Sequence, residues 1–290
     1  MQNLYGTGVA LVTPFDASGN IDFSGLHRVL EHTAQGVDYY VIMGTTGEAG
    51  TTTAKERNEV LDFVRKNNPK KLPIVFGIGG NNTAEVLESI SHTDLTGISA
   101  ILSVSPYYLK PSQEGIYQHF ISIAGKSPVP VILYNVPGRT SSNMTAETTL
   151  RLAGYPGIAG IKEASGNLEQ VMRIIKGKPT DFLVISGDDL LTAGFYAMGG
   201  VGVISVLANA YPLIFKKMKE LGLGGNSRAA FCEQFRLLDI NGPMYEEGSP
   251  VGVKELLSQL GICGPFVRQP HATASASLKA KIKAFREVIN

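Results

Sequence analysis

Short apolar segments alternate with longer amphipathic segments eight times within the first 225 residues of this 290-residue chain. Each short segment is typical of a buried β-strand, and each longer one has the spacing of an amphipathic helix. The predicted strands cover residues 8–13, 39–43, 73–78, 100–104, 129–134, 182–186 and 201–205, with one more within residues 157–166. Eight strand–helix units indicate an α/β protein, a (β/α)8 TIM barrel whose active site lies at the C-terminal strand ends.

Predicted helices fill the intervals between these strands. The first runs from an N-cap at Ser24 to Gly36. Four others cover residues 54–67, 113–124, 168–176 and 193–198. Of the remaining three, one begins at Thr83, one follows an N-cap at Thr145 and the last ends at Leu221. An open, doubly wound sheet is the competing α/β architecture. It is disfavoured because no Gly-x-Gly-x-x-Gly sequence follows the first strand.

Strand patterns stop after Gly225, and three helical segments follow, at 227–239, 251–260 and 275–289. We therefore expect a catalytic barrel domain over residues 1–225. Residues 226–290 are expected to form a C-terminal extension of three helices.

Composition excludes several classes of function. The chain is 43% hydrophobic and 18% charged with a net charge of +1, which suits a soluble globular protein and not a nucleic-acid or membrane-surface protein. No apolar run reaches membrane-spanning length, and the N-terminal residues lack the features of a secretory leader. Cys232 and Cys263 are interpreted as small buried hydrophobes. We therefore expect a cytoplasmic protein.

The segment 157–166 ends an apolar run in a single lysine, Lys162. Strand alternation places Ile158, Gly160, Lys162 and Ala164 on one face, so the lysine has only aliphatic and small neighbours. Burial can lower a lysine pKa from ~10.4 towards ~7–8, where the neutral amine attacks carbonyl groups. A lysine that extends from the strand end to water is the alternative, and this segment alone does not decide between them.

Other reactive side chains fall at the same predicted end of the barrel. They are Thr45 and Thr46 after the second strand, Tyr107 and Tyr108 after the fourth, Tyr134 at the end of the fifth, and Arg139 in the loop that follows it. Singly, such residues are usually turn formers, packing residues or surface charges. Their co-location favours a functional interpretation.

The chemistry that these groups permit is coherent. A neutral lysine adds to a ketone to give a Schiff base, and the protonated imine then lets a proton leave the adjacent carbon. Tyr134, Thr45 and a second tyrosine could carry the protons, and Arg139 could hold a carboxylate in bidentate fashion. Asp188 and Asp189 are interpreted as a helix N-cap. They are not interpreted as a metal site, because no histidine pair accompanies them.

Six motifs stand in order along nearly the whole chain. They are Gly-Thr-Thr-Gly-Glu at 44–48, Pro-Tyr-Tyr at 106–108, Tyr-Asn-Val-Pro-Gly-Arg-Thr at 134–140, Gly-Ile-Lys-Glu-Ala-Ser-Gly at 160–166, Ser-Gly-Asp-Asp at 186–189 and Gly-Val-Ile-Ser-Val at 202–206. Together they resemble the dihydrodipicolinate synthase / N-acetylneuraminate lyase family of class I aldolases. Within it, the segment with Arg139 resembles the synthase branch, in which this arginine holds the carboxylate of L-aspartate 4-semialdehyde.

The resemblance implies roles for the candidate residues. Lys162 would form a covalent Schiff base with the substrate pyruvate, so no separate cofactor is expected. Tyr134 would donate and accept the proton, and Thr45 and Tyr108 would complete its relay, with Tyr108 supplied by a neighbouring subunit.

The remaining implied residues bind substrate. Thr46 would hold the pyruvate carboxylate, Arg139 the aldehyde's carboxylate, and the backbone of Ile204 and Gly187 would line the site. The family implies a homotetramer, a dimer of dimers, that acts in lysine and diaminopimelate biosynthesis.

The chain departs from the family pattern at several positions. Leu109 stands where an asparagine is common. Residues matching the family's lysine-inhibition site are Asn81, Glu85 and Tyr107, whereas Ala49, Ala54 and Arg57 replace the serine and histidines of feedback-sensitive members. We therefore expect inhibition by lysine to be weak or altered.

The predicted function is condensation of pyruvate with L-aspartate 4-semialdehyde. One alternative is another aldolase of the family, such as an N-acetylneuraminate or 2-keto-3-deoxy sugar acid lyase. A second is a catalytically silent barrel that binds a keto acid. The set of Lys162, Tyr134, Thr45 and Tyr108 argues against the silent barrel.

Overall fold

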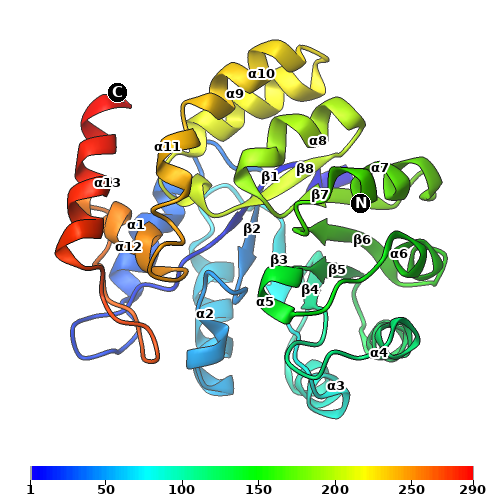
Figure 1. Ribbon diagram of the computed structural model, residues 1–290. Helices are drawn as coiled ribbons and strands as arrows, with labels where there is room; N and C mark the ends of the chain where they lie inside the picture. Colours follow the sequence, from blue (N-terminus) through cyan, green and yellow to red (C-terminus); the bar gives the residue numbers. More distant parts are fainter. Residues whose placement is uncertain (1, 290) are drawn as a thin grey trace.

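Eight parallel strands close into a barrel in which each strand pairs with its sequence neighbours and β8 pairs with β1 (Figure 1). The computed structural model describes residues 2–289. The strands are β1 (Gly6–Ala10), β2 (Tyr39–Ile42), β3 (Ile74–Gly77), β4 (Ala100–Val104), β5 (Val131–Asn135), β6 (Ile158–Glu163), β7 (Leu183–Ser186) and β8 (Gly202–Ser205). The predicted TIM barrel is confirmed, and closure excludes the open sheet.

Helices surround the strands in Figure 1. They are α1 (Phe23–Thr33), α2 (Ala54–Asn67), α3 (Thr83–His92), α4 (Gln113–Lys126), α5 (Pro137–Thr140), α6 (Ala146–Ala153), α7 (Leu168–Gly177), α8 (Thr192–Met198) and α9 (Pro212–Leu223). Four short 3₁₀ helices are η1 (Gln2–Leu4), η2 (Ala49–Thr51), η3 (Asp189–Leu191) and η4 (Leu207–Asn209). From residue 2 to residue 289, none of the helices combines the length and the apolar character needed to cross a bilayer.

Side-chain caps fix where several helices begin. Thr145 caps α6 as predicted, since its side chain accepts a hydrogen bond from the Thr148 amide. The predicted cap at Ser24 is wrong, because Asp22 accepts the Gly25 amide at 2.8 Å and α1 begins at Phe23. A carboxylate two residues earlier therefore takes the position that the serine was expected to fill.

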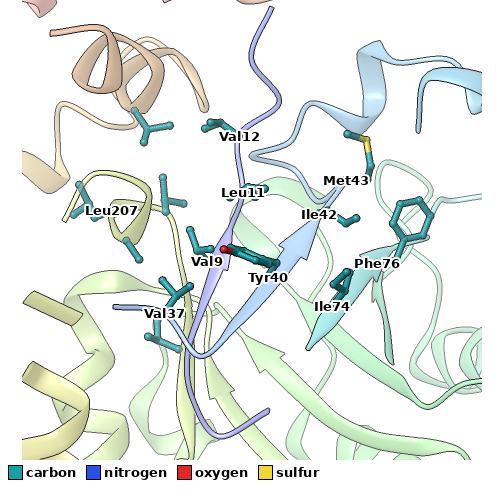
Figure 2. Packing of buried hydrophobic residues seen from close by; sticks show 14 of the residues in the cluster. Val9, Leu11, Val12, Val37, Tyr40, Ile42, Met43, Ile74, Phe76 and Leu207 are labelled. Atoms are coloured by element: carbon teal, nitrogen blue, oxygen red, sulfur yellow. The ribbon is translucent and has the colours of Figure 1, made fainter. Parts of the chain in front are cut away.

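Strand alternation divides the core into two layers. Tyr39 and Val41 belong to the cluster inside the barrel, whereas Tyr40 and Ile42 belong to the cluster between the barrel and its helices, part of which Figure 2 shows. The inner layer requires a glycine at position 8, because a Cβ there would lie 2.2 Å from the ring of Tyr39. A closely filled interior keeps the C-terminal strand ends at fixed positions around the barrel mouth.

Two strands differ from their predicted course. The first was expected at residues 8–13, but β1 ends at Ala10, and the Val12 amide donates to the Asn209 side chain instead of to a strand. In β6 the register with β5 shifts between Val131 and Ile132. Ile158 therefore packs in the outer cluster, and the prediction that it shares a face with Lys162 is wrong.

Four helices follow α9 among the described residues. They are α10 (Ser227–Phe235), α11 (Leu238–Asn241), α12 (Val251–Gln259) and α13 (Ala276–Val288). The single helix predicted over 227–239 is wrong, because α10 ends at Phe235 and α11 begins three residues later. At the end of α10, the Gln234 side chain accepts a 2.8 Å hydrogen bond from the Ala193 amide, which fixes α10 against α8. The C-terminal helices thus pack directly on helices of the barrel.

Arg268, from the segment between α12 and α13, holds the start of α2. Its guanidinium donates to both carboxylate oxygens of Glu56, at 2.6 and 3.1 Å. The same carboxylate closes a capping box with Thr53. The hydrogen bond from Arg268 lowers the pKa of Glu56 to about 2. The ionised carboxylate is therefore favoured in the folded state.

Replacing Glu56 with glutamine should remove a pH-dependent part of the stability. Because the folded-state pKa of Glu56 is depressed, its contribution is present above the unfolded value of 4.5 and is lost as pH falls towards about 2. We expect the variant to be less stable by ~1–2 kcal/mol at pH 7, allowing for partial solvent exposure. Denaturant unfolding at pH 7 and pH 3 measures the difference, which should shrink at the lower pH. Glu88→Gln, at an exposed position on α3, is the control, and a pH-independent difference would contradict the assignment.

Candidate active site

Lys162 and Tyr134 lie side by side at the C-terminal ends of adjacent strands. They are direct partners in the β5–β6 register, and the Lys162 Nζ lies 4.3 Å from the centroid of the Tyr134 ring. Lys162 is 6% exposed and Tyr134 is 7% exposed. The lysine therefore does not extend to water, and its amine is held in the barrel mouth beside a phenol.

A cavity of about 420 Å³ opens above this pair. Six residues predicted for the site line it, namely Thr45, Thr46, Tyr134, Arg139, Lys162 and Gly187. Ile204 lies in the buried cluster inside the barrel and Val206, two residues later, lines the cavity. The cavity is large enough for two small organic acids, and hydroxyl, phenol and guanidinium side chains line it together with Lys162.

The two threonines stand on a tight turn after β2. The turn is closed by backbone hydrogen bonds from Gly47 to Gly44 and from Glu48 to Thr45, both 3.1 Å long. Thr46 is buried, whereas Thr45 is exposed towards the cavity that both residues line. The turn thus presents two adjacent hydroxyl-bearing side chains to the site.

Arg139 belongs to a short helix and not to the predicted loop. Pro137 opens α5, one helical turn directly after β5, and its fixed φ suits the first helical position. The exposed Arg139 side chain lines the 420 Å³ cavity from this turn. A guanidinium at the cavity edge suits recognition of a substrate carboxylate.

Tyr108 lies apart from the other site residues of its own chain. It is 82% exposed and has a left-handed backbone with φ of 69°. Its amide donates to the Thr140 carbonyl at 3.3 Å, which ties this loop to α5. Tyr108 does not line the 420 Å³ cavity.

A second cavity, of about 580 Å³, shares Thr45, Tyr134 and Arg139 with the first. It extends outward along Ala49, Ala54, Arg57 and Tyr107. Asn81 and Glu85, the other residues matched to the lysine-inhibition site, do not line it.

Gly187 leaves room for the lysine side chain. A Cβ at this position would lie 2.7 Å from the Ala164 Cβ and 3.1 Å from both Cγ and Cε of Lys162. Any larger residue would therefore press directly on the side chain that carries the amine.

We expect Gly187→Ala to slow Schiff-base formation about 10- to 100-fold, because a displacement of the amine by less than 1 Å spoils its approach to the carbonyl. The rate at which borohydride traps pyruvate on the protein measures the effect. Gly125→Ala on α4 is the matched control, since its Cβ would meet nothing closer than 3.9 Å. Equal trapping rates in the two variants would contradict the prediction.

The paired aspartates after β7 have separate structural tasks. Asp188 accepts the Leu190 amide at 2.9 Å and caps η3, as predicted. Asp189 does not cap; it is buried and accepts the amides of Val206 and Leu207 at 3.2 and 2.9 Å. Burial raises the pKa of Asp189 to about 6. Within residues 2–289, no three His, Cys, Asp or Glu side chains gather as a metal site would require.

Sequence reasoning missed a buried polar network next to Lys162 and Tyr134. Glu163 accepts hydrogen bonds from Asn135 at 3.0 Å, from Gln170 at 3.1 Å and from the Ser165 amide at 2.7 Å. Asn135 and Glu163 follow Tyr134 and Lys162 in the chain and pair in the same register. Polar residues at positions that alternation assigns to a buried strand face are the signal that could have revealed them.

The C-terminal segment supplies further lining residues that the sequence did not indicate. Asn241, Tyr245 and Ser249 all border the 420 Å³ cavity. They lie more than 75 positions after Lys162, in a region without strand patterns. Only the packing of the C-terminal helices over the barrel mouth brings them to the site.

Comparisons with known proteins identify what this arrangement resembles. A model of the dihydrodipicolinate synthetase family matches residues 3–287. The chain is 47% identical to the 4-hydroxy-tetrahydrodipicolinate synthase of Cytophaga hutchinsonii over 296 residues, and 46% identical to that of Flavobacterium psychrophilum over 292, with full coverage of each chain. A crystal structure of the chloride-inhibited dihydrodipicolinate synthase from Acinetobacter baumannii in complex with pyruvate superposes with a TM-score of 0.95. It is 32% identical and covers 99% of each chain.

Proposed function

The chain belongs to the dihydrodipicolinate synthetase family, and from this membership we infer the reaction of its barrel cavity. The enzyme is a lyase with 4-hydroxy-tetrahydrodipicolinate synthase activity, which condenses pyruvate with L-aspartate 4-semialdehyde in diaminopimelate and lysine biosynthesis. The observation that carries this function is the buried amine of Lys162, 4.3 Å from the Tyr134 ring in a cavity edged by Arg139. The names of the relatives favour the synthase over the other aldolases of the family.

Lys162 is proposed as the covalent catalyst. Its neutral amine attacks the keto carbon of pyruvate, and loss of water gives a protonated Schiff base, so the substrate itself supplies the electron sink. A proton then leaves the methyl carbon to form an enamine, which attacks the aldehyde carbon of the second substrate. The amine of that substrate can displace Lys162 from the imine carbon, which closes the product ring and frees the enzyme.

Tyr134 is proposed to carry the protons in these steps. Its buried side chain lines the same cavity as the lysine amine, which suits repeated transfers to and from the reacting carbons and oxygens. Thr45, which lines that cavity, and Tyr108 would link the phenol to water.

The other site residues are proposed to bind substrate. Thr46 would hold the pyruvate carboxylate and Arg139 the carboxylate of the aldehyde, since both residues line the cavity. Gly187 leaves space beside Lys162 for the substrate, and the backbone of Ile204 would form part of the wall.

We propose that a second copy of the chain completes the site, within a homotetramer built as a dimer of dimers. Tyr107, Tyr108 and Leu109 form an exposed apolar segment beside α5, which suits contact with another subunit. Tyr108 can join the relay only if it enters the cavity of a neighbour.

The division into a catalytic barrel, residues 1–225, and a C-terminal extension, residues 226–290, is kept as a proposal. Asn241, Tyr245 and Ser249 give the extension a part in forming the cavity. A cytoplasmic location is proposed because both substrates are small intermediates of amino-acid biosynthesis.

A coupled assay tests the function. At equal pyruvate, we expect turnover with L-aspartate 4-semialdehyde and none with the aldehyde partners of sialic acid or 2-keto-3-deoxy sugar acid lyases. Arg139→Met should raise the KM for the aldehyde while leaving the KM for pyruvate unchanged. Preference for a sugar aldehyde would overturn the proposal, and absence of any pyruvate adduct would favour the keto-acid-binding barrel.

Inhibition by L-lysine should be weak. The guanidinium of Arg57 lines the outer cavity where feedback-sensitive relatives carry a histidine, and a fixed cation disfavours a second cation. Titration of lysine into the assay should give little inhibition at micromolar concentrations, and Arg57→Ala should bind lysine more tightly than the parent enzyme. Strong micromolar inhibition of the unmodified enzyme would contradict this expectation.

A further inference from the structure

A buried ion pair joins the C-terminal helices to the loop that carries the two threonines. Lys254 on α12 is 0% exposed, and its ammonium donates to the carboxylate of Glu48, which is 3% exposed. The same ammonium donates to the Phe266 carbonyl at 2.8 Å and lies 4.1 Å from the ring centroid of Phe15. A lysine and a glutamate 206 positions apart in the chain are thus enclosed together.

The second oxygen of Glu48 is also bonded from the C-terminal segment. It accepts the backbone amide of Arg268 at 3.1 Å, while the Arg268 guanidinium donates to the Thr51 carbonyl at 3.1 Å. Residues 48 and 51 are therefore both fixed by one extended segment that follows α12. Two charges removed from water need this complete hydrogen bonding. Because a well-packed apolar pair would stabilise the fold as well, stability alone does not explain the ion pair.

Glu48 is part of the turn that presents Thr45 and Thr46. Its amide donates to the Thr45 carbonyl at 3.1 Å, and its carbonyl accepts from the Thr51 amide at 2.9 Å. Its backbone is left-handed, with φ of 54°, a strained conformation for a residue with a side chain. The buried ion pair holds this conformation, and a change of φ at Glu48 would move the two threonines in the cavity.

We propose that Lys254 is a positioning residue for the reaction: through Glu48 it sets where Thr45 and Thr46 stand in the cavity. The C-terminal extension then acts on pyruvate binding from outside the site, since neither Lys254 nor Arg268 lines the 420 Å³ cavity. This inference rests on the function proposed above for the two threonines.

The test removes both charges together. Lys254→Met alone leaves Glu48 as an uncompensated buried anion and can prevent folding. The double variant Glu48→Gln/Lys254→Met removes the anion, and the amide oxygen of the introduced glutamine can still accept the Arg268 amide. We expect it to fold with a Tm near that of the unmodified enzyme, yet to show a KM for pyruvate about tenfold higher and a lower kcat. The KM for the aldehyde should stay unchanged.

The matched control is Lys219→Met/Asp38→Asn. This ion pair, 2.7 Å long, lies next to the N-terminal end of β2, at the opposite end of the barrel. Its loss should leave both KM values unchanged whatever it does to Tm.

Each outcome decides between the two roles. Unchanged kinetics in a folded Glu48→Gln/Lys254→Met variant would overturn the positioning role and leave a purely stabilising one. If that variant does not fold, Glu48→Gln/Lys254→Gln, which also leaves no unpaired buried charge, gives the same comparison. Borohydride trapping of pyruvate in the unmodified enzyme is run alongside, and its absence would mean that the proposed function itself has failed.

Discussion

Lys162→Met will remove condensation activity, with a fall in kcat on the order of 10³-fold or more, because Lys162 is the one lysine among the described residues that line the 420 Å³ cavity. Methionine has a similar length and no amine, so it should fill the site beside Tyr134 without leaving a cavity. The coupled assay measures the loss. Mass spectrometry after borohydride treatment with pyruvate should find the reduced adduct on Lys162 of the unmodified enzyme and none on the variant.

Lys176→Met is the control for Lys162. Lys176 is an exposed lysine in the last turn of α7, and its loss should change neither activity nor trapping. An adduct that persists in the Lys162 variant would mean that a different amine forms the imine. The mechanism proposed above would then be wrong, even if the overall reaction stood.

Tyr134→Phe should separate proton transfer from imine chemistry. The ring that lies 4.3 Å from the Lys162 amine is kept, and only the hydroxyl is lost. We expect kcat to fall by ~10²–10⁴, the usual contribution of a positioned acid–base group. Pyruvate should still be trapped on Lys162, but more slowly, because dehydration of the carbinolamine also needs a proton donor.

Tyr39→Phe is the matched control for Tyr134. Tyr39 lies fully buried in the inner cluster of the same barrel, and its hydroxyl has no hydrogen-bond partner among residues 2–289. Burial raises the pKa of the Tyr39 phenol well above its ordinary value, so it cannot act as a base near neutral pH. Its loss should leave kcat unchanged. An equal effect of the two substitutions would show that the Tyr134 hydroxyl has no special part.

Much of the barrel was predictable because its signals are local. Apolar runs with period two and amphipathic runs with helical spacing identified eight strand–helix units. Their order was sufficient to predict the closed barrel that the structure shows. Because the C-terminal strand ends of such a barrel face one mouth, their positions indicated Lys162, Tyr134, Arg139 and the pairs 45–46 and 107–108. Gly187 and Ile204 came only from the resemblance. The resemblance to a known family then added roles that strand patterns do not contain.

The ends of strands, and the face on which a strand residue lies, were predicted less well where contacts with residues far away in the sequence decide them. Ile158 lies in the outer layer because the β5–β6 register shifts, and nothing in the alternation of β6 indicates that shift. The first strand ends early because Asn209, almost 200 positions away, takes the Val12 amide. A local pattern cannot report a competing partner that only the closed barrel supplies.

The sequence by itself determined the (β/α)8 architecture and the pairing of a strand-end lysine with a strand-end tyrosine, since both follow from period and order along the chain. Only the tertiary structure decided that Lys254 and Glu48 meet and that Gly187 leaves room beside Lys162. The physical reason is that these features depend on which surfaces pack together once the barrel has closed. Packing between residues far apart in the chain produces no periodic pattern in the sequence, so it cannot be read from the sequence alone.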